Sequence, residues 1–210
     1  MKNNVAIREC TAFEELEACV QLQRDVFALP EIEISPVRHL VVTKNAGGFV
    51  IGAFDGGRLV GFVLSVPAFL RSEKAFYSHM TAVHADFQGT GVGAKLKWAQ
   101  RERSLELGVK YIKWTFEPWK ARNAFFNLEK LGAVVTDYQE NFYGIDYATA
   151  STGGPSDPPI HEAGARETAL VLAGGFLLVV TVVMVVAALD RRGGLEVHAE
   201  AGAHRLRRRD

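Results

Sequence analysis

The stretch HADFQGTGVGAKLK, residues 84–97, decides the fold, because glycines separate a strand-like segment from a helical one. Gly89 lies just before a segment, 91–107, that has the composition of a helix, and Gly91 and Gly93 lie at its start. The first amides of a helix have no partner within the helix, and the helix dipole makes this end positive. Glycines leave these amides accessible, since no Cβ stands in front of them. The order strand, glycine loop, helix therefore predicts an anion-binding loop made of backbone.

Two common phosphate-binding loops fit this stretch poorly. A P-loop needs G-x-x-x-x-G-K-[ST], and no Lys-Ser or Lys-Thr follows Gly91 or Gly93 at that spacing. A dinucleotide-binding loop, G-x-G-x-x-G/A, can be read from Gly89 to Ala94, but it requires an acidic residue about 20 positions later. Glu117 lies further away, and the loop does not follow the first strand of the chain. A glycine-rich helix start that binds no ligand is the plain alternative.

Segments with strand and helix character alternate around the loop. The expected strands are 4–9, a hairpin over 48–69 that turns at Asp55-Gly56-Gly57, 75–83, 109–116 and 133–138, and the expected helices are 11–27, 35–45, 91–107 and 119–132. Thr11 and Glu14 form a candidate capping box at the first helix, and Gly132 suits the end of the last. This order predicts an α/β (α+β) fold with a mixed central sheet flanked by helices.

Composition limits the partners and the chemistry. The chain has 24 basic and 24 acidic residues and no net charge, so bulk charge does not indicate a nucleic-acid partner. Cys10 and Cys19 are the only cysteines, and their spacing suits neither a metal site nor a redox motif. The first residues, MKNNVAIREC, lack the apolar core of a secretory signal. We expect no metal, no nucleic acid and a cytoplasmic catalytic domain.

Residues 88–93, QGTGVG, have the form Q-x-x-G-x-G between a strand and a helix. This resembles the pyrophosphate-binding motif of the GNAT superfamily of N-acetyltransferases, and the resemblance covers roughly residues 4–147. The surrounding stretches YSHMTAV, YIKWTFEPWKARNAFFNLEKLGAVV and NFYG are similar to a group of bacterial members without a clear substrate. The resemblance implies the acyl-CoA N-acyltransferase fold, acetyl-CoA as the cosubstrate, and transfer of an acetyl group to a small-molecule or peptide amine.

The resemblance also implies where acetyl-CoA binds. The end of the strand before the loop would pair with the pantetheine arm, the loop amides would hold the pyrophosphate, and an asparagine in the last helix would bond the arm. The implied cofactor-binding residues are Thr81, Ala82, Val83, Gln88, Gly89, Thr90, Gly91, Val92, Gly93, Ala94 and Asn123. Lys95 and Lys97 either add charge near the 3′-phosphate or form a solvated helix face.

The catalytic residues are less defined. Glu117, just past the strand at 109–116, and His79, on the central strand with Tyr77 and His84 beside it, are the two candidates for the general base. Many members of the superfamily place a tyrosine acid four residues before the glycine that ends the last helix, and here that position is Leu128. Tyr138, Tyr143 or water would have to replace it. Trp119, Lys120 and Arg122 are expected near the mouth of the site.

The C-terminal sequence does not fit the resemblance. Residues 151–168 read as a linker, 169–189 carry no charge, and 190–210 form an arginine-rich tail, whereas 1–150 hold the acetyltransferase domain. A helix over 169–189 would span a bilayer core of about 30 Å, so we expect a C-terminal apolar helix that is a candidate transmembrane anchor. The final strand of the sheet is then missing, and the open edge would suit pairing in a homodimer.

The charges of the tail conflict with an enzyme in the cytoplasm. Arginines cluster after 169–189, so the positive-inside rule places the acetyltransferase domain outside. The alternatives are an anchor that overrides the charge bias, a tail that stems from an altered reading frame, or a domain without activity. The runner-up function is accordingly a membrane-anchored, inactive acyl-CoA-binding or interaction module.

Overall fold

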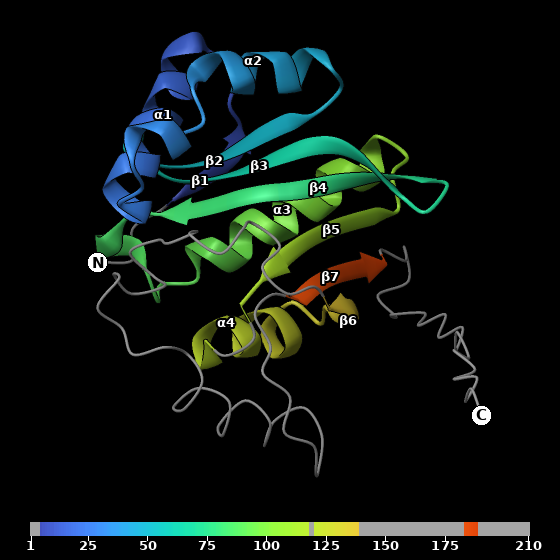
Figure 1. Cartoon of the computed structure of the whole chain (residues 1–210). Coiled ribbons are helices and arrows are strands. Elements are labelled where there is room, and N and C mark those ends of the chain that lie inside the picture. Colours follow the sequence, from blue (N-terminus) through green and yellow to red (C-terminus); the bar gives the residue numbers. More distant parts are fainter. Residues whose placement is uncertain (1–4, 118–119, 139–182, 189–210) are drawn as a thin grey trace, which may run out of the picture.

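The computed structural model describes residues 5–117, 120–138 and 183–188, and in this part a seven-stranded mixed sheet forms the centre of the protein (Figure 1). The strands lie in the order β1-β2-β3-β4-β5-β7-β6. Among the strands that the structure describes, only β4 and β5 pair in parallel, and the other neighbours are antiparallel. The strands are β1 Ala6–Glu9, β2 Phe49–Asp55, β3 Arg58–Leu70, β4 Glu73–Val83, β5 Tyr111–Phe116, β6 Val134–Tyr138 and β7 Val183–Ala188.

Helices cover both faces of this sheet. α1 (Phe13–Phe27) and α2 (Val37–Asn45) lie on one face, and α3 (Val92–Glu106) lies on the other (Figure 1). α4 (Ala121–Phe125) continues as a π-helix, η3 (Phe126–Lys130), and two short 3₁₀ helices are η1 (Glu31–Glu33) and η2 (Ala85–Phe87). Two apolar clusters result. One packs α1 and α2 on the sheet around Leu40 and Phe62, and the other packs α3 on it around Leu96 and Val63.

These elements confirm the mixed α/β prediction. The hairpin turns at Gly56 and Gly57, whose φ angles are +54° and +92°, and Asp55 pairs with Arg58 across the turn. Two consecutive positive φ angles are the conformation that favours glycine in a two-residue hairpin loop. The predicted strand at 75–83 and the predicted helix at 91–107 agree with β4 and α3.

The predicted capping box at the first helix is wrong by one residue. α1 begins at Phe13, and the carboxylate of Glu15, not Glu14, accepts hydrogen bonds from the amides of Thr11 (2.8 Å) and Ala12 (3.2 Å). Arg8 also binds Glu15 at 2.5 Å, which fixes this carboxylate at the helix start.

The predicted helix at 119–132 is partly wrong. The α-helical turn ends at Phe125, and Leu131 then donates to the carbonyl of Phe126, five residues back, at 3.0 Å. Asn127 Nδ2 donates a hydrogen bond to the carbonyl oxygen of Asn123 at 2.8 Å, and the helix widens at this point. Gly132 follows with a φ of +66°, as expected for a helix-ending glycine.

The predicted C-terminal apolar helix is wrong for residues 183–188, which form β7. This strand lies between β5 and β6 and pairs antiparallel with both, from Tyr111↔Ala188 to Phe116↔Val183 on one side. The apolar sequence VMVVAA suits a buried strand as well as a helix, and the length of the uncharged stretch had favoured a helix. Residues 169–182 and 189, the linker and the arginine-rich tail lie outside the described residues. Among the residues that are described, no helix is long and apolar enough to cross a membrane.

β7 also corrects the prediction of a missing final strand. The position between β5 and β6 is filled by the chain itself, so the open edge on which the homodimer expectation rested is not present there. The sheet is instead bounded by β1 and β6.

Candidate active site

β4 and β5 separate along their length and leave an opening in the sheet. Their parallel pairing consists of Ala75↔Tyr111, Phe76↔Ile112 and Tyr77↔Lys113. β4 then continues to Val83 and β5 to Phe116 with no further pairing between them. Within the described residues no other strand fills this opening, so the backbone amides and carbonyls of β4 that face it are available to a ligand.

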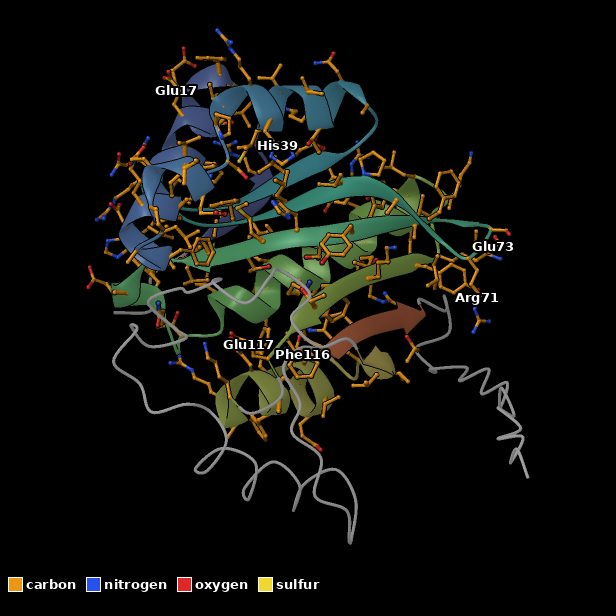
Figure 2. The ribbon with its side chains drawn as sticks, viewed as in Figure 1. Glu17, His39, Arg71, Glu73, Phe116 and Glu117 are labelled. Carbon is orange, nitrogen blue, oxygen red and sulfur yellow. The ribbon has the colours of Figure 1, made fainter. Side chains whose placement is uncertain are left out.

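A β-bulge bends β4 at the closed end of this opening. Ser65 of β3 pairs with Ser78 and Leu64 pairs with Met80, so His79 is the extra residue on β4. A bulge turns the strand and redirects the side chains beyond it. The ring of His79 lies on the face covered by α2, where it contacts His39 with a distance of 5.6 Å between ring centroids. Figure 2 shows His39 on α2, directed toward the sheet.

The glycine loop lies at the open end of β4. Gly89 and Gly91 have φ angles of +78° and +89°, and Gly91 immediately precedes α3. A Cβ at either glycine would have no atom within 4 Å, so these two glycines are required by backbone conformation and not by crowding. In the described part of the chain, the amides of Val92 and Gly93 have no backbone acceptor. These amides at the start of a long helix form the predicted anion site.

Hydrogen bonds fix the loop against the strand that it follows. Gln88 Nε2 donates to the carbonyl oxygen of Val83 at 3.1 Å, and Thr90 Oγ1 donates to the carbonyl oxygen of Phe87 at 2.6 Å. Gly93 faces the end of β4 and the last helix, since a Cβ there would lie 3.8 Å from Val83 Cγ2 and from Phe126 Cζ. The loop, the end of β4 and η3 thus converge on one mouth.

Arg58 is a charged residue at this mouth that the sequence did not indicate. Its guanidinium lies 3.0 Å from Nε2 of His84, and Nδ1 of His84 accepts from the amide of Asp86 at 3.3 Å. His84 therefore holds the start of the loop and is not directed at His79. Arg58 comes from the hairpin, far away in sequence, so only the paired strands bring it here.

The environment of His79 favours a neutral ring. Burial lowers the pKa of His79 from its ordinary value, and the nearby His39 lowers it further. A neutral imidazole can accept a proton at neutral pH. Tyr77 lies on the same side of β4, with its ring centroid 6.5 Å from that of His79.

Glu117, the other candidate base, is engaged in an ion pair. Its Oε2 lies 2.5 Å from Nζ of Lys120, and both side chains are 18% exposed. Figure 2 shows Phe116 and Glu117 at the end of β5, close to α4. The structure therefore separates the two candidates, because His79 lies at the closed end of the opening and Glu117 at the end of β5, next to α4.

Tyr77 and Thr115 connect the two separating strands on the His79 side. The Tyr77 hydroxyl lies 3.3 Å from Oγ1 of Thr115. Thr115 was not predicted as a site residue, and only the alternation of β5 side chains could have indicated it. Trp119 and Tyr143 lie outside the described residues, and Tyr138 is described only as part of β6.

Lys97 differs from both expectations for it. The residue is only 8% exposed, and its Nζ donates to Ser78 Oγ at 2.8 Å and lies 4.0 Å from the centroid of the Trp114 ring. Lys95, two residues earlier, is exposed. Lys97 therefore points into the protein under the opening instead of toward solvent or a phosphate.

The last helix, α4 with η3, packs against Trp114 next to Lys97. Trp114 Nε1 donates to Oδ1 of Asn127 at 2.8 Å, and Asn127 is 6% exposed. Leu128, where a tyrosine is usual in the superfamily, packs against the α3-side cluster. Asn123 is half-buried and lies one turn earlier, near the mouth.

An opened parallel strand pair with a glycine loop and helix at its end is the architecture of an acyl-CoA-dependent acyltransferase. The model of the GNAT acetyltransferase family matches residues 12–133. The chain therefore belongs to the GNAT acetyltransferase family, and its cosubstrate is acetyl-CoA.

Solved structures share this fold. The ribosomal-protein-S18-alanine N-acetyltransferase of Escherichia coli is 13% identical, with a TM-score of 0.59 over 89% of this chain and 94% of that one. A GNAT acetyltransferase of Elizabethkingia anophelis with acetyl-CoA bound is 15% identical (TM-score 0.57; 89% and 99% covered). The PaiA N-acetyltransferase of Thermoplasma acidophilum, in complex with coenzyme A, is 16% identical (TM-score 0.53; 65% and 93% covered). None of the curated proteins matches the sequence.

Proposed function

We propose that this protein transfers the acetyl group of acetyl-CoA to an amine that enters from the α1–α2 face of the sheet. The observation that carries the proposal is the opening between β4 and β5, which has the glycine loop at its wide end and His79 at its closed end. A linear cofactor that binds its phosphates at the loop and lies along β4 would bring its thioester close to His79.

The cofactor would be held mainly by backbone. The amides of Gly89, Thr90, Gly91, Val92, Gly93 and Ala94 would bind the pyrophosphate, with Gln88 fixing the loop, and Thr81, Ala82 and Val83 would pair with the pantetheine arm. Arg58 supplies positive charge at this end. Asn123, near the mouth, would bond the arm from the other side.

His79 is our choice as general base. The bulge directs its ring to the α2 face, where an acceptor amine can approach, and its lowered pKa keeps it neutral at pH 7. Glu117 is less suited because Lys120 occupies its carboxylate. The proton of the attacking amine would pass to His79 as the carbon–nitrogen bond forms.

The β-bulge at His79 would polarise the carbonyl bond of the thioester. His79 has no partner on β3, and a backbone amide at this bulge would donate to the thioester carbonyl. Such a preorganised donor stabilises the negative charge that develops on this oxygen. Holding the amine and the thioester together in one opening would supply the rest of the rate enhancement.

The acceptor would be an amine, and the test covers small-molecule amines and peptides. Thiol release from acetyl-CoA would be followed with a panel of polyamines, aminoglycosides and peptides with free N-termini, using the full chain. We expect amine-dependent release that is lost in His79→Gln, while Glu117→Gln retains most of it. Binding of acetyl-CoA without release by any amine would contradict the enzymatic proposal.

A further inference from the structure

Lys97 is a buried cation at the closed end of the opening. Its two contacts, Ser78 on β4 and Trp114 on β5, are each the first residue beyond the last paired position, Tyr77↔Lys113. The amino group thus lies on the α3 face of the sheet, directly beneath the point at which the strands separate. His79 lies on the opposite, α2 face of the same point.

The charge of Lys97 has no counterion in the described part of the chain. No carboxylate of residues 5–117, 120–138 or 183–188 forms an ion pair with its Nζ, and burial lowers its pKa to about 7. A buried cation without a partner is costly, so the position favours an anion that forms close to it. The ammonium has three donors, of which Ser78 accepts one.

The other groups around this point are already engaged. Trp114 Nε1 bonds Asn127, Leu128 is apolar, and the Tyr77 hydroxyl contacts Thr115 on the opposite face. Arg101, the other charged residue near Lys97, is ion-paired with Glu102 at 2.7 Å. Lys97 is therefore the donor that the described residues offer on the α3 side.

We infer that the ammonium group of Lys97 stabilises the thiolate of the departing coenzyme A, an inference that rests on the acetyl transfer proposed above. The amine nitrogen forms a bond to the thioester carbon, the carbon–sulfur bond breaks, and its electron pair stays on sulfur. Lys97 Nζ donates a hydrogen bond to this thiolate, which leaves as the anion and gains its proton from solvent, and His79 takes the proton lost by the amine. A cation and a base thus act from opposite faces of the sheet.

The direct test is the ionisation of coenzyme A when it is bound to the full-length protein. The ultraviolet absorbance of the thiolate would be titrated against pH, with binding measured in parallel by calorimetry. We expect the pKa of the bound thiol to lie about 1–3 units below that of free coenzyme A, because a cation lies beside it. Lys97→Met should abolish this shift, whereas Lys110→Met, on the exposed surface between α3 and β5, should retain it.

Kinetics give a second readout. Lys97→Met should lower kcat by about 100-fold or more, because it removes a donor that stabilises the developing anion, and leave the KM for acetyl-CoA unchanged. A bound thiol that titrates like free coenzyme A in the wild-type protein would overturn the inference, even if the variant failed to fold. The same shift in Lys97→Met would also overturn it. Absence of coenzyme A binding would instead overturn the proposed function, and this inference with it.

Discussion

Gln88 Nε2 donates to the carbonyl oxygen of Val83 at 3.1 Å and so ties the glycine loop to the last residue of β4. The loop and the strand are the two parts of the proposed cofactor site, one for the phosphates and one for the pantetheine arm. Their relative position depends on this exposed side chain. A preorganised loop loses less conformational entropy when the ligand binds.

Gln88→Ala should weaken acetyl-CoA binding without unfolding the protein. One exposed hydrogen bond contributes about 0.5–1.5 kcal/mol, which corresponds to about a 2- to 12-fold increase in Kd. Calorimetry measures this change. Gln21→Ala is the matched control, since Gln21 makes a comparable exposed bond to Asp25 on α1 at 2.9 Å. Equal affinities for both variants would contradict a role of Gln88 in holding the loop.

His79→Gln should reduce kcat by about 100-fold or more if this residue is the base. The wild-type rate should also fall at low pH. Because burial lowers the pKa of His79, the ring is neutral above its ordinary value of about 6.5 and gains a proton only below it. The profile of kcat/KM against pH should therefore stay flat down to this value and fall beneath it. A profile that is the same in wild type and His79→Gln would assign the base to another group.

The buried pair of Trp114 and Asn127 should stabilise the last helix against β5. Asn127→Leu leaves the Trp114 N–H without its acceptor, which costs about 1–3 kcal/mol of unfolding free energy. Combining it with Trp114→Phe, which removes that N–H, should recover part of the loss. Urea unfolding of both single variants and the double variant gives the coupling energy. Additive losses would mean that the hydrogen bond contributes nothing.

A proline in β7 tests the assignment of residues 183–188 to the sheet. Val185 pairs with Trp114 on one side and with Val135 on the other, so Val185→Pro removes a ladder hydrogen bond in the interior of the sheet. The control is Val135→Pro on β6, which is an edge strand. We expect the larger drop in the urea midpoint for Val185→Pro. A wild-type midpoint in Val185→Pro would contradict the strand.

Local chemistry allowed the sequence to predict the loop and most of the elements. Glycines with positive φ, the Asp55-Gly56-Gly57 turn and the helix at 91–107 depend on neighbours in the chain, and they are found where they were expected. The family resemblance supplied the cofactor. These features need no knowledge of which segments pair.

Contacts between segments that are distant in the chain could not be predicted from the sequence. Valines at 183–188 suit a buried strand as well as a membrane helix, and only pairing with β5 and β6 decides between them. Lys97 lies in a helix of mixed character, where its burial follows from Ser78 and Trp114, each on another strand.

Titration of acetyl-CoA into the full-length protein tests the central claim most directly, namely that the loop before α3 is the cofactor cradle. Gly91→Asp places a side chain on a backbone with φ +89° and adds a negative charge at the start of α3. Gly108→Asp is the matched control, because its φ is +73° and its Cβ also meets nothing within 4 Å, but it lies past the other end of α3. We predict saturable binding in the wild type and in Gly108→Asp, and none in Gly91→Asp. Undiminished binding by Gly91→Asp, or no binding by the folded wild-type protein, would contradict the account.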